Sequence, residues 1–266
     1  MFAFVKKLLT LSLVVYLGVC AALFFAQESL LFKPDSQVAN KSAIFPEATE
    51  YRIPVNDTLS LQAWFRPPRH ADAITVVMLH GNAGNLSTRK RHIDNFRDTE
   101  RGFLIFSWRG YGNNAGIPSE AGLYADAQAV LDWLNHKGIP DTHIVLYGES
   151  LGSGVALEMA AHRQFKGVML GAPYTSITEM AKRDYPWVPI ELLLKHPFDS
   201  LSKLPQVTEP LAILHSRDDR VIPFALGKEL AEHAQAPKRL YDFSDRGHTG
   251  FNKTDLDTAL TWILEQ

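Results

Sequence analysis

The chain of 266 residues is long enough for one large domain with a substantial core, and 46% of its residues are hydrophobic. Its 27 Lys and Arg residues balance 29 Asp and Glu residues, which excludes a polybasic nucleic-acid-binding protein and an acidic disordered chain. The one cysteine, Cys20, cannot form an intrachain disulfide, which excludes a disulfide-stapled scaffold.

The first predicted element is an apolar segment of 19 uncharged residues, from Leu8 to Ala26. A helix of this length rises about 28 Å, close to the ~30 Å thickness of the hydrocarbon layer of a membrane. A cleaved signal peptide is disfavoured because a cut after Ala26 would place Phe24 at position −3. A lipoprotein processing site at Cys20 is disfavoured because Val19 precedes it and further apolar residues follow.

A buried N-terminal helix is disfavoured as well, because the segment carries no polar face. We therefore expect residues 1–28 to form an uncleaved, single-pass transmembrane anchor and residues 29–266 to form the folded domain. Lys6 and Lys7 precede the apolar segment. The positive-inside rule then predicts a cytoplasmic N-terminus, with the domain on the non-cytoplasmic side of the membrane.

Beyond the anchor, strand-like and helix-like segments alternate. Eight apolar or β-branched runs predict strands at Tyr51–Val55, Leu61–Phe65, Ile74–Leu79, Phe103–Trp108, His143–Tyr147, Val168–Leu170, Leu211–Leu214 and Leu240–Phe243. The first two flank Asn56 and Asp57, which predicts a hairpin. The others are continuous apolar runs, typical of parallel strands buried on both faces. Helical patterns that start near Ser119, Pro223 and Asp255 complete an α/β sheet with helices on both faces.

Residues 173–209 interrupt this alternation with five prolines and several aromatic residues. Long insertions in compact domains are usually functional. We expect a cap of short helices over the edge of the sheet; the alternative is a surface excursion without a role.

The run from Gly148 to Gly152 reads Gly-Glu-Ser-Leu-Gly and lies between a predicted strand and a predicted helix. In this context a G-x-S-x-G forms a sharp turn that exposes the serine hydroxyl. The N-terminus of the following helix supplies N–H donors where an oxyanion would form. Ser150 is therefore the candidate nucleophile, and an ordinary Gly/Ser turn is the alternative.

A reactive serine needs a general base and an acid that orients the base. His248 lies in a glycine-flanked loop between the last predicted strand and the last predicted helix, and it is the candidate base. Asp218 and Asp219 both follow the predicted strand at 211–214, where the acid is expected. The pattern alone leaves both aspartates open.

The loop after the predicted strand at 74–79 reads His-Gly-Asn-Ala-Gly-Asn. An oxyanion hole combines an N–H from such a loop with the N–H that follows the nucleophile. We therefore expect the backbone N–H groups of Asn82 and Leu151 to form this hole, and His80 to brace the loop.

With these motifs in order, the chain resembles the α/β-hydrolase superfamily, and within it the small membrane-anchored serine hydrolases of the Bem type. These are related to dienelactone hydrolases and to the catalytic domain of prolyl oligopeptidase. The resemblance rests on the HGNAGN, GESLGSGVA, HSRDDRVIP and RGHTGF motifs, and its departures, such as Ser216 in place of a glycine, avoid the candidate site. It implies an eight-stranded, mostly parallel sheet and selects Asp219, four residues before Pro223, as the acid.

The resemblance also implies cleavage of carboxylic ester or thioester bonds through an acyl-enzyme on Ser150, with no metal or cofactor. The cap favours an apolar acyl group and the anchor a membrane-proximal, lipid-like or small-molecule substrate; no nucleic-acid partner is expected. A peptidase or amidase of the same fold is one alternative. The other is a catalytically silent, membrane-tethered binding protein, which a complete set of Ser150, Asp219 and His248 disfavours. Substrate-binding residues and oligomeric state are not assigned.

Overall fold

The structure is a computed structural model that describes residues 1–97 and 99–266. Within this part of the chain, eight strands form one sheet in the order β10-β9-β8-β7-β4-β6-β3-β2. Their bounds are β2 (Thr49–Pro54), β3 (Ser60–Arg66), β4 (Thr75–Leu79), β6 (Gly102–Phe106), β7 (Ile144–Glu149), β8 (Gly167–Gly171), β9 (Leu211–Ser216) and β10 (Lys238–Phe243). The predicted strands and the α/β class are confirmed.

The sheet is parallel from β10 to β6 and antiparallel at β3 and β2. β2 and β3 form the predicted hairpin, in which Thr49 pairs with Phe65 and Pro54 with Ser60. The chain reverses its direction of travel across the sheet between β6 and β7, and β7 is added beside β4. Ligands bind at the carboxyl ends of strands at such a switch point.

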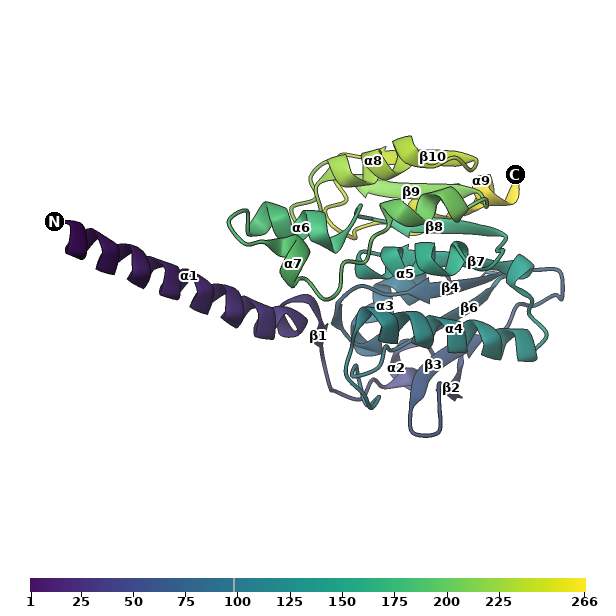
Figure 1. Cartoon of the computed structure of the whole chain (residues 1–266). Coiled ribbons are helices and arrows are strands. Elements are labelled where there is room, and N and C mark those ends of the chain that lie inside the picture. Colours follow the sequence, from purple (N-terminus) through teal and green to yellow (C-terminus); the bar gives the residue numbers. More distant parts are fainter. Residues whose placement is uncertain (98) are drawn as a thin grey trace.

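Helices cover both faces of the sheet (Figure 1). One face carries α4 (Glu120–His136), α5 (Leu151–Ala160) and α8 (Phe224–His233), and the other carries α3 (Lys90–Asn95) and α9 (Lys253–Leu264). Successive residues of β4 belong to opposite layers of the core, because side chains alternate along a strand. This two-sided burial explains why the central strands are uninterrupted apolar runs.

Three short helices occupy the expected cap at residues 173–209: α6 (Ile177–Asp184), α7 (Ile190–Leu193) and η3 (Leu201–Gln206). The remaining short elements are α2 (Lys41–Ile44), η1 (Leu86–Arg89) and η2 (Asp141–His143). A separate pair of two-residue strands, β1 (Lys33–Pro34) and β5 (Ala83–Gly84), joins the start of the domain to the loop after β4.

The N-terminal segment is one continuous helix, α1 (Phe2–Leu31), which projects from the domain (Figure 1). It extends past residue 28, where the anchor was expected to end, and stops two residues before β1. Among the described residues, α1 is the one helix that is long and apolar enough to cross a membrane.

Candidate active site

Ser150 lies in the turn between β7 and α5, at the carboxyl edge of the sheet. Its φ of 51° and ψ of −121° belong to a region that residues with a Cβ rarely adopt, at a cost of order 1–3 kcal/mol. The turn is held because Ser150 N donates to Gly171 O (2.9 Å) and Ser153 Oγ donates to Ser150 O (2.6 Å). A side chain at Gly152 would collide with the backbone of Leu79, which explains the second glycine of the motif.

The three residues predicted as nucleophile, base and acid form one hydrogen-bonded chain. His248 Nε2 lies 3.0 Å from Ser150 Oγ, and His248 Nδ1 lies 2.8 Å from Asp219 Oδ2. The other carboxylate oxygen of Asp219 accepts from the backbone N–H groups of Val221 (2.8 Å) and Ile222 (3.0 Å). This geometry matches a serine nucleophile, a base within reach of its proton and an acid that orients the base.

Asp219 is held in its ionised form. Burial alone would raise the pKa of this carboxyl, but hydrogen bonds from His215 and His248, and the N–H of Ile222, keep the pKa well below its usual range. An ionised Asp219 fixes the proton of His248 on Nδ1, so that Nε2 is free to accept a proton from Ser150.

His215 is a second imidazole at this aspartate, and it was not predicted from the sequence. Its ring is fully buried, and its Nε2 lies 3.0 Å from Ile222 O and 3.4 Å from Asp219 Oδ2. The ring therefore braces the loop that carries the acid, and it approaches the same carboxylate oxygen of Asp219 as His248 does.

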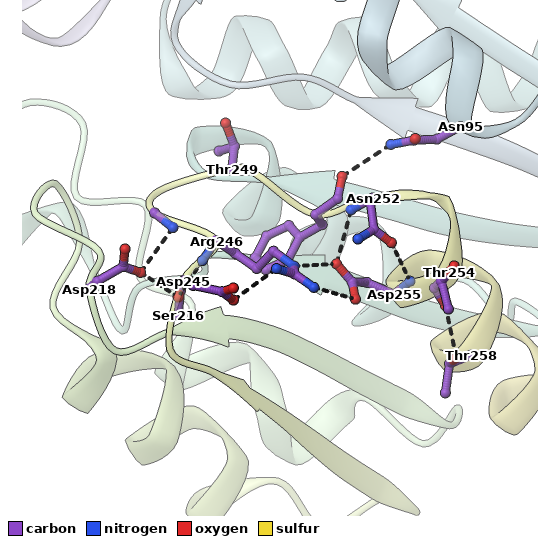
Figure 2. A network of polar contacts seen from close by, with 12 residues as sticks. Asn95, Ser216, Asp218, Asp245, Arg246, Thr249, Asn252, Thr254, Asp255 and Thr258 are labelled. Atoms are coloured by element: carbon purple, nitrogen blue, oxygen red, sulfur yellow. Dashed lines mark hydrogen bonds and ion pairs between the residues drawn. The ribbon is translucent and has the colours of Figure 1, made fainter.

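The loop that carries His248 is fixed by a network of polar contacts (Figure 2). Arg246 pairs with the buried Asp255 of α9 (2.7 Å), and its backbone N–H donates to Ser216 Oγ (3.0 Å). Asp218 accepts from Ser216 Oγ (2.5 Å) and from Gly247 N (2.9 Å). The two adjacent aspartates thus have different tasks: Asp219 contacts the imidazole of His248, and Asp218 holds the backbone immediately before it.

The expected oxyanion-hole residues lie beside the nucleophile. Leu151 follows Ser150 directly, and Asn82 follows Gly81, where an ideal Cβ would lie 3.3 Å from Ser150 Cβ. In the described part of the chain, neither backbone N–H donates to a protein acceptor. His80 is buried, with its Nδ1 2.8 Å from Gly81 O, and it braces this loop.

The same loop is tied to the end of α1. The side-chain amide of Asn82 donates to Leu31 O (2.7 Å), and Asn82 O accepts from Lys33 N (2.9 Å) and from the hydroxyl of Tyr111 (2.7 Å). The pairing of β1 with β5 extends this connection. The segment that leaves the N-terminal helix therefore positions Asn82.

A buried hydrogen bond between Glu149 and His92 supports the nucleophile turn, and it too was not predicted from the sequence. Glu149 precedes Ser150, and its carboxylate lies 2.8 Å from His92 Nε2 and 3.2 Å from the hydroxyl of Tyr147. Burial would raise the pKa of Glu149, but the charges of His92 and Arg89 hold it below its usual value. Glu149 thereby connects α3 to the strand that presents the nucleophile.

A cavity of about 430 Å³ adjoins Ser150 and extends between α1 and the cap. Its apolar walls come from both, with Leu23, Phe24, Leu30, Leu31, Ile177, Met180, Ala181, Val188, Ile190 and Leu193 among the lining residues. The volume falls within the ~300–1,000 Å³ typical of small-molecule sites. The arrangement provides an apolar chamber that ends at a nucleophile.

Comparison with known proteins identifies the family of this chain. A family model described as alpha/beta hydrolase fold matches residues 74–194. The uncharacterised protein Rv2307c of Mycobacterium tuberculosis is 31% identical over 234 residues, which cover 87% of this chain and 83% of that protein. The chain belongs to the α/β-hydrolase superfamily.

One relative has a named activity, and one solved structure shares the fold. The lysophosphatidylserine lipase ABHD12 of Mus musculus is 30% identical over 203 residues, covering 68% of this hydrolase and half of the mouse protein. The esterase Pf2001 of Pyrococcus furiosus shares the fold, with a TM-score of 0.70 at 19% identity over 88% of this chain and 97% of the esterase. The predicted α/β-hydrolase fold is therefore confirmed.

Proposed function

We propose that this α/β hydrolase is a membrane-anchored serine hydrolase that cleaves carboxylic ester or thioester bonds. The observation that carries the proposal is the hydrogen-bonded chain from Ser150 Oγ through His248 to Asp219, built on a strained turn. Strain persists at functional sites when the surroundings enforce it. The mouse relative named as a lysophosphatidylserine lipase and the esterase with the same fold support ester chemistry.

The proposed reaction has two stages, and each uses the hydrogen-bonded chain described above. Ser150 Oγ attacks the acyl carbon while His248 Nε2 takes the hydroxyl proton, and the backbone N–H groups of Asn82 and Leu151 stabilise the oxyanion. Collapse of this intermediate breaks the bond to the alcohol or thiol, which leaves with the proton from His248. Water then attacks the acyl-enzyme and gives a proton to His248. The bond between the acyl carbon and Ser150 Oγ breaks, Oγ takes this proton from His248, and the carboxylic acid is released.

The proposed anchor is α1. Its apolar residues are largely exposed to solvent, which a membrane would cover. Lys6 and Lys7 favour a cytoplasmic N-terminus and a catalytic domain on the opposite side. Anchoring is tested by an alkaline carbonate wash, after which the full-length protein should remain in the membrane. Orientation is tested with protease, which should digest the domain only from the non-cytoplasmic side.

The nucleophile is tested with a fluorophosphonate probe on the native protein, on Ser150→Ala and on Ser202→Ala. Ser202 is an exposed serine outside the site and serves as the matched control. The native protein and Ser202→Ala should both be labelled and should both hydrolyse p-nitrophenyl esters. Ser150→Ala should lose labelling and hydrolysis. Labelling that survives in Ser150→Ala would assign the nucleophile elsewhere; a folded native protein without labelling would favour a silent binding protein.

A further inference from the structure

The C-terminal half of α1 is packed against the cap. The hydroxyl of Tyr16 donates to Trp187 O (3.0 Å), and their rings meet edge to face at 6.3 Å. Further along, the side chain of Gln27 donates to Leu193 O (3.2 Å) and accepts from Lys195 N (2.7 Å). These contacts join the helix and the cap from the middle of α1 to its end. In Figure 1, α6 and α7 lie near the C-terminal part of α1.

This packing makes α1 a wall of the cavity that ends at Ser150. Leu23 and Phe24 line the cavity from the helix, opposite Met180 and Ala181 of α6. The segment with the composition of a membrane anchor and the segment that lines the cavity at Ser150 are thus parts of one helix.

The length of α1 places the cap at the membrane. The uncharged part of α1 that precedes its first polar contact with the cap, Leu8–Val15, has eight residues and rises about 12 Å, which is less than the ~30 Å of hydrocarbon that an anchor must cross. A spanning α1 must therefore be immersed beyond Tyr16, to the level of the cap. The cap carries Trp187 and Leu192 there, whose exposed fractions are 51% and 84%. Trp and Tyr are enriched at membrane interfaces.

We propose, building on the proposed function, that α1 and the cap form an acyl-chain pocket whose mouth opens at the membrane surface. The substrate is an ester or thioester of a single-chain amphiphile that enters directly from the membrane in which α1 is anchored. The apolar walls select the acyl chain, and the cavity of about 430 Å³ lies in the lower half of the ~300–1,000 Å³ range of ligand sites, which fits one chain. The polar part of the amphiphile remains at the interface.

The pocket wall is tested with full-length protein in phosphatidylcholine vesicles and 4-methylumbelliferyl esters from butyrate to palmitate. For the native protein, kcat/KM should rise with chain length, by up to about fourfold per buried methylene, until the pocket is filled. Leu23→Trp narrows the cavity, and the ratio of palmitate to butyrate hydrolysis should fall at least tenfold. Leu23→Ala should move the optimum to longer chains, so that the test does not depend on one variant.

The matched control is Leu17→Trp, the same substitution on the same helix at a residue that is 55% exposed and outside the cavity lining. Its chain-length profile should equal that of the native protein. Equal profiles for Leu23→Trp and Leu17→Trp would overturn the role of α1 in the pocket. Fluorophosphonate labelling of Ser150 in the same samples separates this failure from a failure of the proposed function, in which labelling itself is absent.

Entry from the membrane is tested with the double variant Trp187→Ser, Leu192→Ser. The rate on palmitate ester in vesicles, divided by the rate on the same ester in detergent micelles, should fall at least tenfold relative to the native protein. An unchanged ratio would overturn entry from the membrane. A preference of more than tenfold for a diacyl phospholipid over a monoacyl lipid would overturn the assignment to single-chain substrates.

Discussion

The strained backbone of Ser150 leads to a prediction about stability that is independent of substrate. Glycine adopts positive φ without a Cβ penalty, so Ser150→Gly removes a strain of order 1–3 kcal/mol. The flexible glycine adds a cost of about 0.5–1 kcal/mol through the unfolded chain. The appropriate reference is Ser150→Ala, because both variants lose the hydroxyl that contacts His248 and only alanine retains the strain.

We expect Ser150→Gly to be more stable than Ser150→Ala by about 1 kcal/mol, which corresponds to about 2–4 °C in Tm for a domain of this size. Thermal unfolding of the full-length proteins in the same detergent measures the difference. Both variants should be inactive, so a gain in stability would accompany the loss of the reaction.

Ser153 supplies the internal control. It lies in α5, where glycine is less favourable than alanine by about 1 kcal/mol, so Ser153→Gly should be the less stable of its pair. A reversal of sign between positions 150 and 153 is the expected signature. If Ser150→Gly melts at or below the temperature of Ser150→Ala, the turn is not strained and the reasoning fails.

Three further predictions concern buried polar contacts. Asp219→Asn should lower kcat by about 10⁴-fold. In the native protein the folded-state pKa of Asp219 is depressed, so the contribution of this carboxylate to stability is present above about pH 4 and lost in acid. The free energy of unfolding should therefore fall more between pH 5 and pH 2 in the native protein than in Asp219→Asn. Arg109→Ala leaves the buried Asp126 without its cation and should lower the free energy of unfolding, measured in urea, by about 3–5 kcal/mol. The loss should be smaller at pH 5 than at pH 8, because burial raises the pKa of Asp126 and favours its protonation at the lower pH. Asn82→Ala removes the hydrogen bond to Leu31 O and should lower kcat about 3- to 10-fold on short esters.

Controls for these variants come from exposed residues. Asp245→Asn changes a surface carboxylate near the His248 loop. Compared with Asp219→Asn, it should have little effect on kcat or on the loss of unfolding free energy between pH 5 and 2. Arg217→Ala breaks an exposed pair with Asp242 and should cost less than about 1 kcal/mol. Equal losses for Arg217→Ala and Arg109→Ala would contradict the argument from burial.

The fold was predictable where each element carries its own signal. The central strands are apolar on both faces, and Ser119 caps α4 through a hydrogen bond to Gly122 N, so pattern and structure coincide. β1 and β5 have two residues each, too few for any periodicity. Their pairing depends on where α1 ends, which the sequence does not state.

The candidate site was predictable where loops follow predicted strands, and Ser150 and His248 were selected from their positions in such loops. The choice between Asp218 and Asp219 required the family resemblance, because only the folded loop turns Asp219 inward through the N–H groups of Val221 and Ile222. Glu149 and His92 are 57 positions apart, and only tertiary packing joins them. Likewise, hydropathy indicates a membrane span in α1 but not that half of the helix packs against the cap.

The short connection between α1 and the domain has a kinetic consequence. Phe32 N donates to Glu28 O, and Lys33 already belongs to β1, so no loose spacer separates the helix from the sheet. Under the proposed anchoring, the domain stays at a fixed distance from the membrane and encounters substrate by lateral diffusion in two dimensions. Turnover should then follow the mole fraction of substrate in the bilayer: added inert lipid slows it, whereas dilution of the same vesicles with buffer leaves it unchanged.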